Sequence, residues 1–213
     1  MRTGSLFLMM LVLSAPALVA QSSSDGKLLA AARQGRVERV QELLDAGADV
    51  NFRNARGVTP LIQAVERRHG DVAELLLSRG AEVCGTALHR IAVRGGPDLL
   101  ALALAQTTDP AAIGEPALLH AAFLGRTAEV ALLLDHGVDI DAVHPDRQTT
   151  PLIQACEQGK VETVRLLLER GADVHARDAH GRTALRATTH GEEASPAERE
   201  EITAMLLRAG ASD

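Results

Sequence analysis

The chain has 213 residues, with 22 Lys and Arg against 28 Asp and Glu for a net charge of −6, and 46% of its residues are apolar. The apolar part is almost entirely aliphatic and alanine, since the chain has three Phe, no Tyr and no Trp. This composition argues against a disordered chain, and against a globular enzyme, because enzymes usually close their cores and pockets with bulky aromatic rings. It favours thin helices that approach one another closely through small side chains.

Residues 1–20 have the layout of a secretory signal peptide. A short basic start precedes an apolar run over residues 6–13, and small residues with one Pro follow. Cleavage is expected after Ala17 or Ala20, and the mature protein is expected in the periplasm or outside the cell. A retained membrane anchor is the alternative. As a helix, the apolar stretch up to Ala20 would span about 22 Å, which is short of a ~30 Å hydrocarbon core.

Internal repetition dominates the rest of the sequence. The hexapeptide Thr-Pro-Leu-Ile-Gln-Ala occurs at Thr59–Ala64 and again at Thr150–Ala155, and each copy leads into a Leu-rich stretch that closes on a Gly. The interval between successive closing glycines is 33 residues from 47 to 80 and 34 residues from 137 to 171. The closing phrase recurs with its glycine at Gly47, Gly80, Gly137, Gly171 and Gly210.

Each repeat predicts two short antiparallel helices. Thr59 and Thr150 can cap the first helix, with Pro60 and Pro151 at its first position. The second helix places its Leu and Val side chains on one side. The closing glycine supplies the left-handed residue that ends this helix, and an extended finger follows. No unit can bury its Leu face alone, so the units must stack.

This pattern strongly resembles the ankyrin repeat, a 33-residue unit that begins T-P-L-H-x-A, over residues 25–213. The resemblance implies an all-α solenoid of stacked helix-turn-helix units with short β-hairpin-like fingers. The ankyrin-repeat domain is expected over 21–213. Its units are expected as a start cap at 25–51, middle units at about 54–82, 83–113, 114–144 and 145–177, and an end unit at 178–213.

The centre of the array departs from regular spacing. Only 27 residues separate Thr59 from Thr86, so the finger between the first two middle units is expected to be about six residues short. Over Gln106–Glu115 the Gly-Ala phrase is missing, and Asp109 followed by Pro110 predicts a helix cap and a short extra turn. The shortened fingers could leave either a gap or a kink in the array.

Charge and cysteine content add two expectations. Loss of residues 1–20 removes one Arg and no acid, which leaves 21 basic and 28 acidic residues and a net charge of −7. Such a charge disfavours nucleic acid and membrane surfaces as partners after signal cleavage. In the repeat arrangement Cys84 and Cys156 lie about two units apart, beyond the ~7 Å Cα limit of a disulfide, so two free thiols are expected.

Ankyrin arrays bind partners through finger tips and the concave side of each first helix, and the resemblance carries these positions over to this chain. Phe123 and Leu124 stand where neighbouring units carry charge, and they are predicted to form an apolar anchor of the interface. The alternative is that the irregular centre folds over Phe123 and uses it as core. On the first helices the matching positions are Arg33, Gln34, Glu66, Arg67, Val93, Arg94, Phe123, Leu124, Glu157 and Gln158. On the fingers they are Arg56, Val58, Arg147, Thr149, His180 and Arg182.

Histidines and nearby acids in the chain raise the question of a metal site. Asp139 and Asp173, however, fall in the phrase that follows the closing glycine, where an acid caps a turn. His69 and His89 lie at or near positions where ankyrin units use His to bond neighbouring loops, and His120 is expected to face the core. No metal and no cofactor are therefore expected. Nucleophile, zinc-protease and phosphate-loop signatures are absent from the sequence, so the chain is predicted not to be an enzyme.

The predicted function is that of a protein-binding module, monomeric on its own, that acts as a scaffold or protective partner of a periplasmic protein. Neither Asn51 nor Asn54, the only asparagines, begins an N-x-S/T site, which favours a bacterial periplasm over a eukaryotic secretory route. An immunity-type inhibitor of a toxin or enzyme is one alternative. A small-ligand or metal carrier, or an enzyme, built on the irregular central segment is the alternative from another class.

Overall fold

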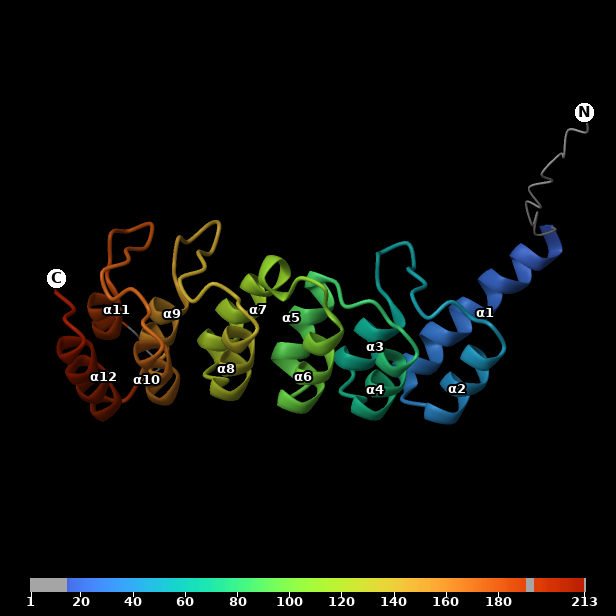
Figure 1. The fold of residues 1–213 in the computed structure, drawn as a ribbon, viewed down its shortest axis with the longest axis horizontal. Helices are drawn as coiled ribbons and strands as arrows, with labels where there is room; N and C mark the ends of the chain where they lie inside the picture. Colours follow the sequence, from blue (N-terminus) through green and yellow to red (C-terminus); the bar gives the residue numbers. More distant parts are fainter. Residues whose placement is uncertain (1–14, 191–193, 213) are drawn as a thin grey trace, which may run out of the picture.

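The computed structural model describes residues 15–190 and 194–212, which form helices joined by turns and loops, with no strand in these ranges. The helices follow one another as antiparallel pairs along an extended array (Figure 1). The pairs are α1 (Ala15–Gln34) with α2 (Val37–Asp45), α3 (Pro60–Glu66) with α4 (Gly70–Ser78), α5 (Gly85–Arg94) with α6 (Pro97–Gln106), α7 (Pro110–Leu124) with α8 (Thr127–Asp135), α9 (Pro151–Glu157) with α10 (Val161–Glu169), and α11 (Ala184–His190) with α12 (Pro196–Arg208).

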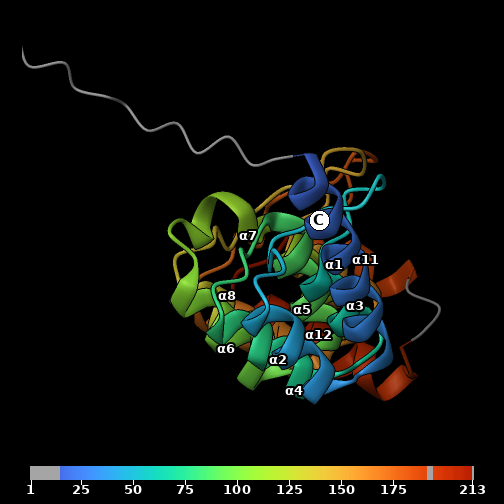
Figure 2. The ribbon, with the colours of Figure 1, turned by 90° about the vertical axis from the view of Figure 1, so that its right-hand side faces the viewer.

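The pairs stack into two layers. Odd-numbered helices pack against one another in chain order, and even-numbered helices do the same in a second layer. Seen along the array, α2, α4, α6 and α8 lie on one side and α1, α3 and α5 on the other, with the finger loops projecting beyond them (Figure 2). The prediction of an all-α solenoid of stacked helix pairs is confirmed.

A continuous strip of Leu, Ile, Val and Ala fills the space between the two layers. Leu76, Leu104 and Leu133 are fully buried in the even-numbered helices, opposite Leu88 and Ile153 of the odd-numbered helices. Burial of such a side chain contributes about 1.5–3 kcal/mol each, so the stacking of units supplies the stability that no single pair could reach.

Local signals set the ends of the helices as the sequence predicts. The hydroxyl of Thr59 accepts the backbone N–H of Ile62 at 3.2 Å, and that of Thr150 accepts the N–H of Ile153 at 3.4 Å. Past the second helix, Gly171 has a φ of +84°, a left-handed conformation that costs glycine little. Threonine caps at the start and glycine at the end therefore fix the length of the units that carry both signals, such as α9 with α10.

Three long fingers, over 46–59, 136–150 and 170–183, project from the array, while the connections at 79–84 and 107–109 are short (Figure 1). The Asp109 carboxylate accepts the N–H of Ala112 at 3.1 Å and caps α7 as predicted. The extra turn is part of α7 itself, so this helix runs through the expected boundary between residues 113 and 114.

The expected signal peptide, residues 1–20, lies only partly within the described residues. Residues 1–14 lie outside the described residues, and both expected cleavage points, after Ala17 and Ala20, fall in the first turns of α1. Within residues 15–190 and 194–212, no helix combines the length and the apolar character that crossing a bilayer requires.

Candidate functional site

A hollow of about 420 Å³, called the central hollow below, lies where α5, α7 and α9 meet the finger 136–150. One part of its wall is apolar and is formed by Pro116, Leu119, Phe123, Val143 and Pro145. The other part carries imidazoles and a guanidinium from His89, His120, His144 and Arg147, together with Glu115 and Gln154. Odd-numbered helices and a finger thus build one recess at the irregular centre of the array.

Phe123 is half-buried in the wall of the central hollow, so it is neither enclosed in the core nor free in solvent. Its ring meets that of His120 edge-on, with centroids 6.2 Å apart and planes at 78°. Leu124 at the end of α7 is 40% exposed, and Val143 on the finger is 52% exposed. Apolar side chains therefore lie along one side of a recess that is open to a partner.

His89 and His120 bridge α5 and α7 inside the central hollow. Nε2 of His89 lies 2.7 Å from Nδ1 of His120, so one ring donates and the other accepts. Burial, then the facing His120 and Arg90, lower the pKa of His89 below its ordinary value. Burial, then Arg90 and Arg126, lower the pKa of His120 in the same way. Both rings are thus neutral at neutral pH.

The expectation that His120 faces the core is wrong. It is half-buried at the wall of the hollow, because its place on α7 turns it toward His89 of the neighbouring unit. His69 does bond a neighbouring unit, since its Nε2 lies 3.3 Å from the backbone carbonyl oxygen of Arg33.

A second recess of about 590 Å³, called the N-terminal hollow below, lies between α1, α3 and the finger 46–59. Polar side chains predominate in its wall, with the backbone of Gly26 and the apolar Leu29, Ala30 and Val58 beside them. The structure brings five of the predicted contact residues together here, namely Arg33, Gln34, Arg56, Val58 and Arg67.

The remaining predicted contact residues are spread along the same side of the array. Arg147 is exposed and lines the central hollow, and His180 is exposed on the last finger. Arg94 is exposed at the end of α5, with the half-buried Val93 beside it, and Gln158 is half-buried past the end of α9. Apart from Arg147, none of these residues lines either hollow.

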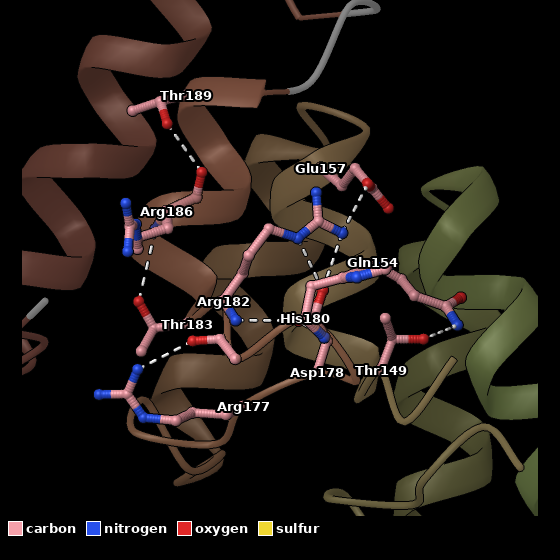
Figure 3. Close-up of polar contacts among 11 residues, drawn as sticks. Thr149, Gln154, Glu157, Arg177, Asp178, His180, Arg182, Thr183, Arg186 and Thr189 are labelled. Atoms are coloured by element: carbon pink, nitrogen blue, oxygen red, sulfur yellow. Dashed lines mark hydrogen bonds and ion pairs between the residues drawn. The ribbon is translucent and has the colours of Figure 1, made fainter. Parts of the chain in front are cut away.

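Other predicted contact residues are engaged within the protein. Arg182 contacts Asp178, with its Nε 2.8 Å and its Nη2 2.7 Å from Oδ2, and its Nη2 also lies 3.4 Å from Oε1 of Glu157 (Figure 3). Glu66 accepts the side-chain amide of Gln63 at 3.3 Å and lies 3.7 Å from Nε of Arg90. Thr149 is buried and its hydroxyl accepts the side-chain amide of Gln154 at 3.0 Å. The expectation that Thr149 contacts a partner is therefore wrong, because it supports the base of the finger.

Each long finger has a side-chain acceptor in its second half that binds two backbone N–H groups. Asn54 Oδ1 accepts the N–H groups of Arg56 and Val58, at 2.9 and 3.0 Å. Asp178 Oδ1 accepts those of His180 and Arg182, both at 2.9 Å. Burial raises the pKa of Asp178, but the hydrogen bonds from Arg182 and His180 outweigh it and hold this pKa below its ordinary value.

His144 is the acceptor of the middle finger, since its Nδ1 accepts the N–H groups of Asp146 and Arg147, both at 3.3 Å. The sequence did carry a signal for this role, because Asn54, His144 and Asp178 each stand five residues before a threonine at the base of the finger. In the described ranges, no three His, Cys, Asp or Glu side chains gather as a metal site would require.

Neighbouring fingers are also joined to each other. The backbone N–H of Ala179 donates to the carbonyl of Arg147 at 3.0 Å, and the N–H of Asp173 donates to the carboxylate of Asp141 at 2.9 Å. At the other end, the side-chain amide of Asn51 donates to the carbonyl of Gly80 at 3.2 Å.

A two-layer array of helix pairs, with fingers on one side and recesses beneath them, defines a repeat solenoid. The family profile described as ankyrin repeats (3 copies) matches residues 10–87, 88–178 and 141–211. The chain belongs to the ankyrin repeat family. Ankyrin repeats generally mediate protein–protein interactions, and their fold is typically a non-catalytic interaction module.

Solved ankyrin structures extend over most of the chain. An ankyrin repeat protein named EF0377 is 31% identical with a TM-score of 0.75, over 86% of this chain and 98% of that one. The ankyrin repeat domain of Bcl-3, a member of the IkappaB protein family, is 29% identical with a TM-score of 0.71, over 87% and 86%. An ankyrin repeat domain from Acinetobacter baumannii AYE is 25% identical with a TM-score of 0.74, over 87% and 98%.

Curated relatives match shorter segments. Cyclin-dependent kinase 4 inhibitor B of Mus musculus is 52% identical over 60 residues, which are 28% of this chain and 45% of the relative. Mitochondrial disaggregase of Bos taurus is 44% identical over 61 residues, which are 29% of this chain and 9% of the relative. The alignments thus span less than half the length of these relatives.

Proposed function

We propose that this chain is a non-catalytic module that binds a protein partner on the side of its fingers and odd-numbered helices, as a scaffold or protective partner in a bacterial periplasm. The observation that carries the proposal is the central hollow, where Phe123, Leu119 and Val143 offer an apolar recess beside neutral imidazoles. Apolar anchors that enter such recesses dominate the binding energy of protein interfaces. The secretory layout of residues 1–20 supports the location.

The chemistry of the central hollow supports binding over catalysis. Its lining holds no Ser, Thr, Cys or Lys, its one carboxylate, Glu115, is exposed, and Nδ1 of His144 already accepts two backbone N–H groups. Its two best-placed bases, His89 and His120, are hydrogen-bonded to each other. A volume of about 420 Å³ falls in the range of small-molecule pockets, so a bound small molecule is the competing occupant that a test must detect.

The test is affinity capture from a periplasmic extract, with three tagged baits: the wild-type chain, Phe123→Ala and Leu207→Ala. Leu207 is the matched control because it is 56% exposed on α12, in the other layer. One partner should be retained by wild type and by Leu207→Ala. Phe123→Ala should bind that partner at least about tenfold more weakly, which corresponds to about 1.4 kcal/mol, with unchanged helicity by circular dichroism.

Equal binding by all three baits would reject the central hollow as the anchor. A captured enzyme that stays active in the complex supports the scaffold or protective role, and one that is silenced supports an immunity-type inhibitor. A small molecule or metal found in the native mass of the purified chain, with no protein captured, would favour the carrier alternative.

A further inference from the structure

Charge is divided unevenly between the two layers of the array. The odd-numbered helices and the turns that follow them, residues 15–36, 60–69, 85–96, 110–126, 151–160 and 184–190, hold ten Lys and Arg against four Asp and Glu. The even-numbered helices hold four Arg against thirteen Asp and Glu. Counted over the helices alone, the odd-numbered ones carry a net charge of +1 and the even-numbered ones −9. The turns after the odd-numbered helices add five cations, namely Arg36, Arg67, Arg68, Arg126 and Lys160.

Arginines beside the acidic layer are neutralised within the protein. Arg39 lies 2.7 Å from Glu42, and Arg79 lies 2.7 Å from Asp45. Arg165 and Arg170 make comparable contacts with acids further along the array. These cations are therefore already satisfied and offer little to a partner.

Three arginines of the N-terminal hollow are different. Arg33, Arg56 and Arg67 are exposed, and in the part of the chain that the structure describes none of them has a carboxylate within 4.0 Å. All three line the same recess, whose wall contains no Asp or Glu. Gln34 and Gln63 add side-chain amides that can donate hydrogen bonds there. Three like charges at one recess repel each other, and an anion that binds between them relieves this repulsion.

Resting on the proposed function, we propose that the partner contacts this face with an acidic protein segment. Its Asp and Glu side chains bind Arg33, Arg56 and Arg67 in the N-terminal hollow, and an apolar side chain further along the same segment enters the central hollow at Phe123. Guanidinium groups suit this role because they pair with carboxylates through two parallel hydrogen bonds.

A protein segment fits this face better than a nucleic acid. The lining of the N-terminal hollow, where the arginines gather, contains no aromatic side chain on which a base could stack. Leu29 and Val58 line the N-terminal hollow, and apolar side chains also dominate one wall of the central hollow. A long polyanion would in addition meet the acidic layer behind the array. A short acidic stretch beside an apolar residue matches both recesses.

The spacing of the helices sets the length of this segment. Packed helices lie about 8–10 Å apart, so the two to three units between the hollows correspond to about 20–30 Å. An extended chain covers about 3.3 Å per residue, so about six to nine residues separate the acids from the apolar anchor. A labelled peptide of about 14 residues can therefore reach both recesses.

The experiment measures fluorescence anisotropy at low ionic strength with the full chain and three probes. The first probe is a peptide with five acids followed, about eight residues on, by a Leu-Phe pair, made in both chain orders. The second has Gln and Asn in place of the acids, and the third is a single-stranded DNA of similar length. The protein variants are Arg33→Gln with Arg67→Gln, and the control Arg39→Gln with Arg79→Gln, which removes the same charge from the acidic layer.

We expect the acidic peptide to bind at least about tenfold more tightly than its amide counterpart, and the affinity to fall as salt is added. The Arg33 and Arg67 substitutions should weaken binding by about tenfold or more, and the control pair by less than about twofold. Equal binding of the acidic and amide peptides, an equal loss in the control, or tighter binding of DNA would each overturn the proposal. If capture depends on Phe123 while the acidic peptide does not bind, this inference fails and the proposed function stands.

Discussion

The substitution Gly114→Ala tests how closely the finger 136–150 packs on α7. This residue is buried within α7, and a Cβ added to it would lie 2.4 Å from Cγ2 of Val138. Helix propensity alone favours Ala over Gly by about 1 kcal/mol. Overpacking of a core costs about 1–3 kcal/mol, and the β-branched side chain of Val138 is restricted at χ1 and buried, so it cannot move aside easily. We therefore expect Gly114→Ala to destabilise the fold by about 1 kcal/mol.

The same substitution should have the opposite effect once Val138 is shortened. In a Val138→Ala background the obstructing methyl groups are gone, so Gly114→Ala should stabilise the protein by up to about 1 kcal/mol. Urea unfolding of the four proteins, followed by circular dichroism, gives the coupling energy, which we expect to be about 1–3 kcal/mol. A coupling near zero, or a stabilising Gly114→Ala in the Val138 protein, would refute the close approach of the finger to α7.

Three further predictions concern titration, the last finger and the thiols. The pKa values of His89 and His120 in the folded protein lie below their ordinary value of 6.5. As the pH falls, these two side chains therefore bind protons at a higher pH in the unfolded chain than in the folded protein. Thermal stability should therefore fall as the pH drops through about 6.5, and less so when both are changed to Gln. Asp178→Ala should cost about 1–3 kcal/mol in urea unfolding, because it leaves the N–H groups of the finger without an acceptor. Iodoacetamide should modify the half-buried Cys84 but spare Cys156, whose pKa burial raises to about 12, as peptide mass mapping would show.

Each of these three would be contradicted by a simple result. An unchanged pH profile in the double Gln variant would exclude the imidazole pair as its cause. For the finger, the exposed Asp146 serves as a control site, and an equal cost of Asp146→Ala would show that the Asp178 hydrogen bonds are not specific. Rapid labelling of Cys156 in the folded protein would mean that α9 opens readily.

Local signals explain why much of the fold could be predicted. Thr59 and Ser195 cap their helices through contacts only three residues away, and Ser195 forms a capping box with Glu198. The closing glycines act within a single turn in the same way. Because each signal needs only neighbours in sequence, helix ends and finger positions follow from the sequence without knowledge of the tertiary structure.

Contacts between units explain what could not be predicted. The pairing of His89 with His120 and the contact of Arg182 with Glu157 join residues of different units, at distances that side-chain directions decide. α7 passes through Pro116, which lacks a backbone N–H and which sequence rules would place at a helix start. The contact positions carried over from the ankyrin repeat therefore located the concave side. They did not distinguish exposed side chains such as Arg67 from side chains such as Arg182, which is paired with acids of the same protein.

The hydrogen bonds between the last two fingers reduce the conformational entropy that a partner must remove when it binds. Ordering one backbone residue costs about 1–2 kcal/mol, and loops that become ordered only in a complex add this cost to association. The fingers that carry Arg147 and His180 are already held in register by the Ala179 and Asp173 bonds. A partner that contacts both fingers therefore meets a surface whose backbone order was established during folding, and little conformational freedom remains to be lost there.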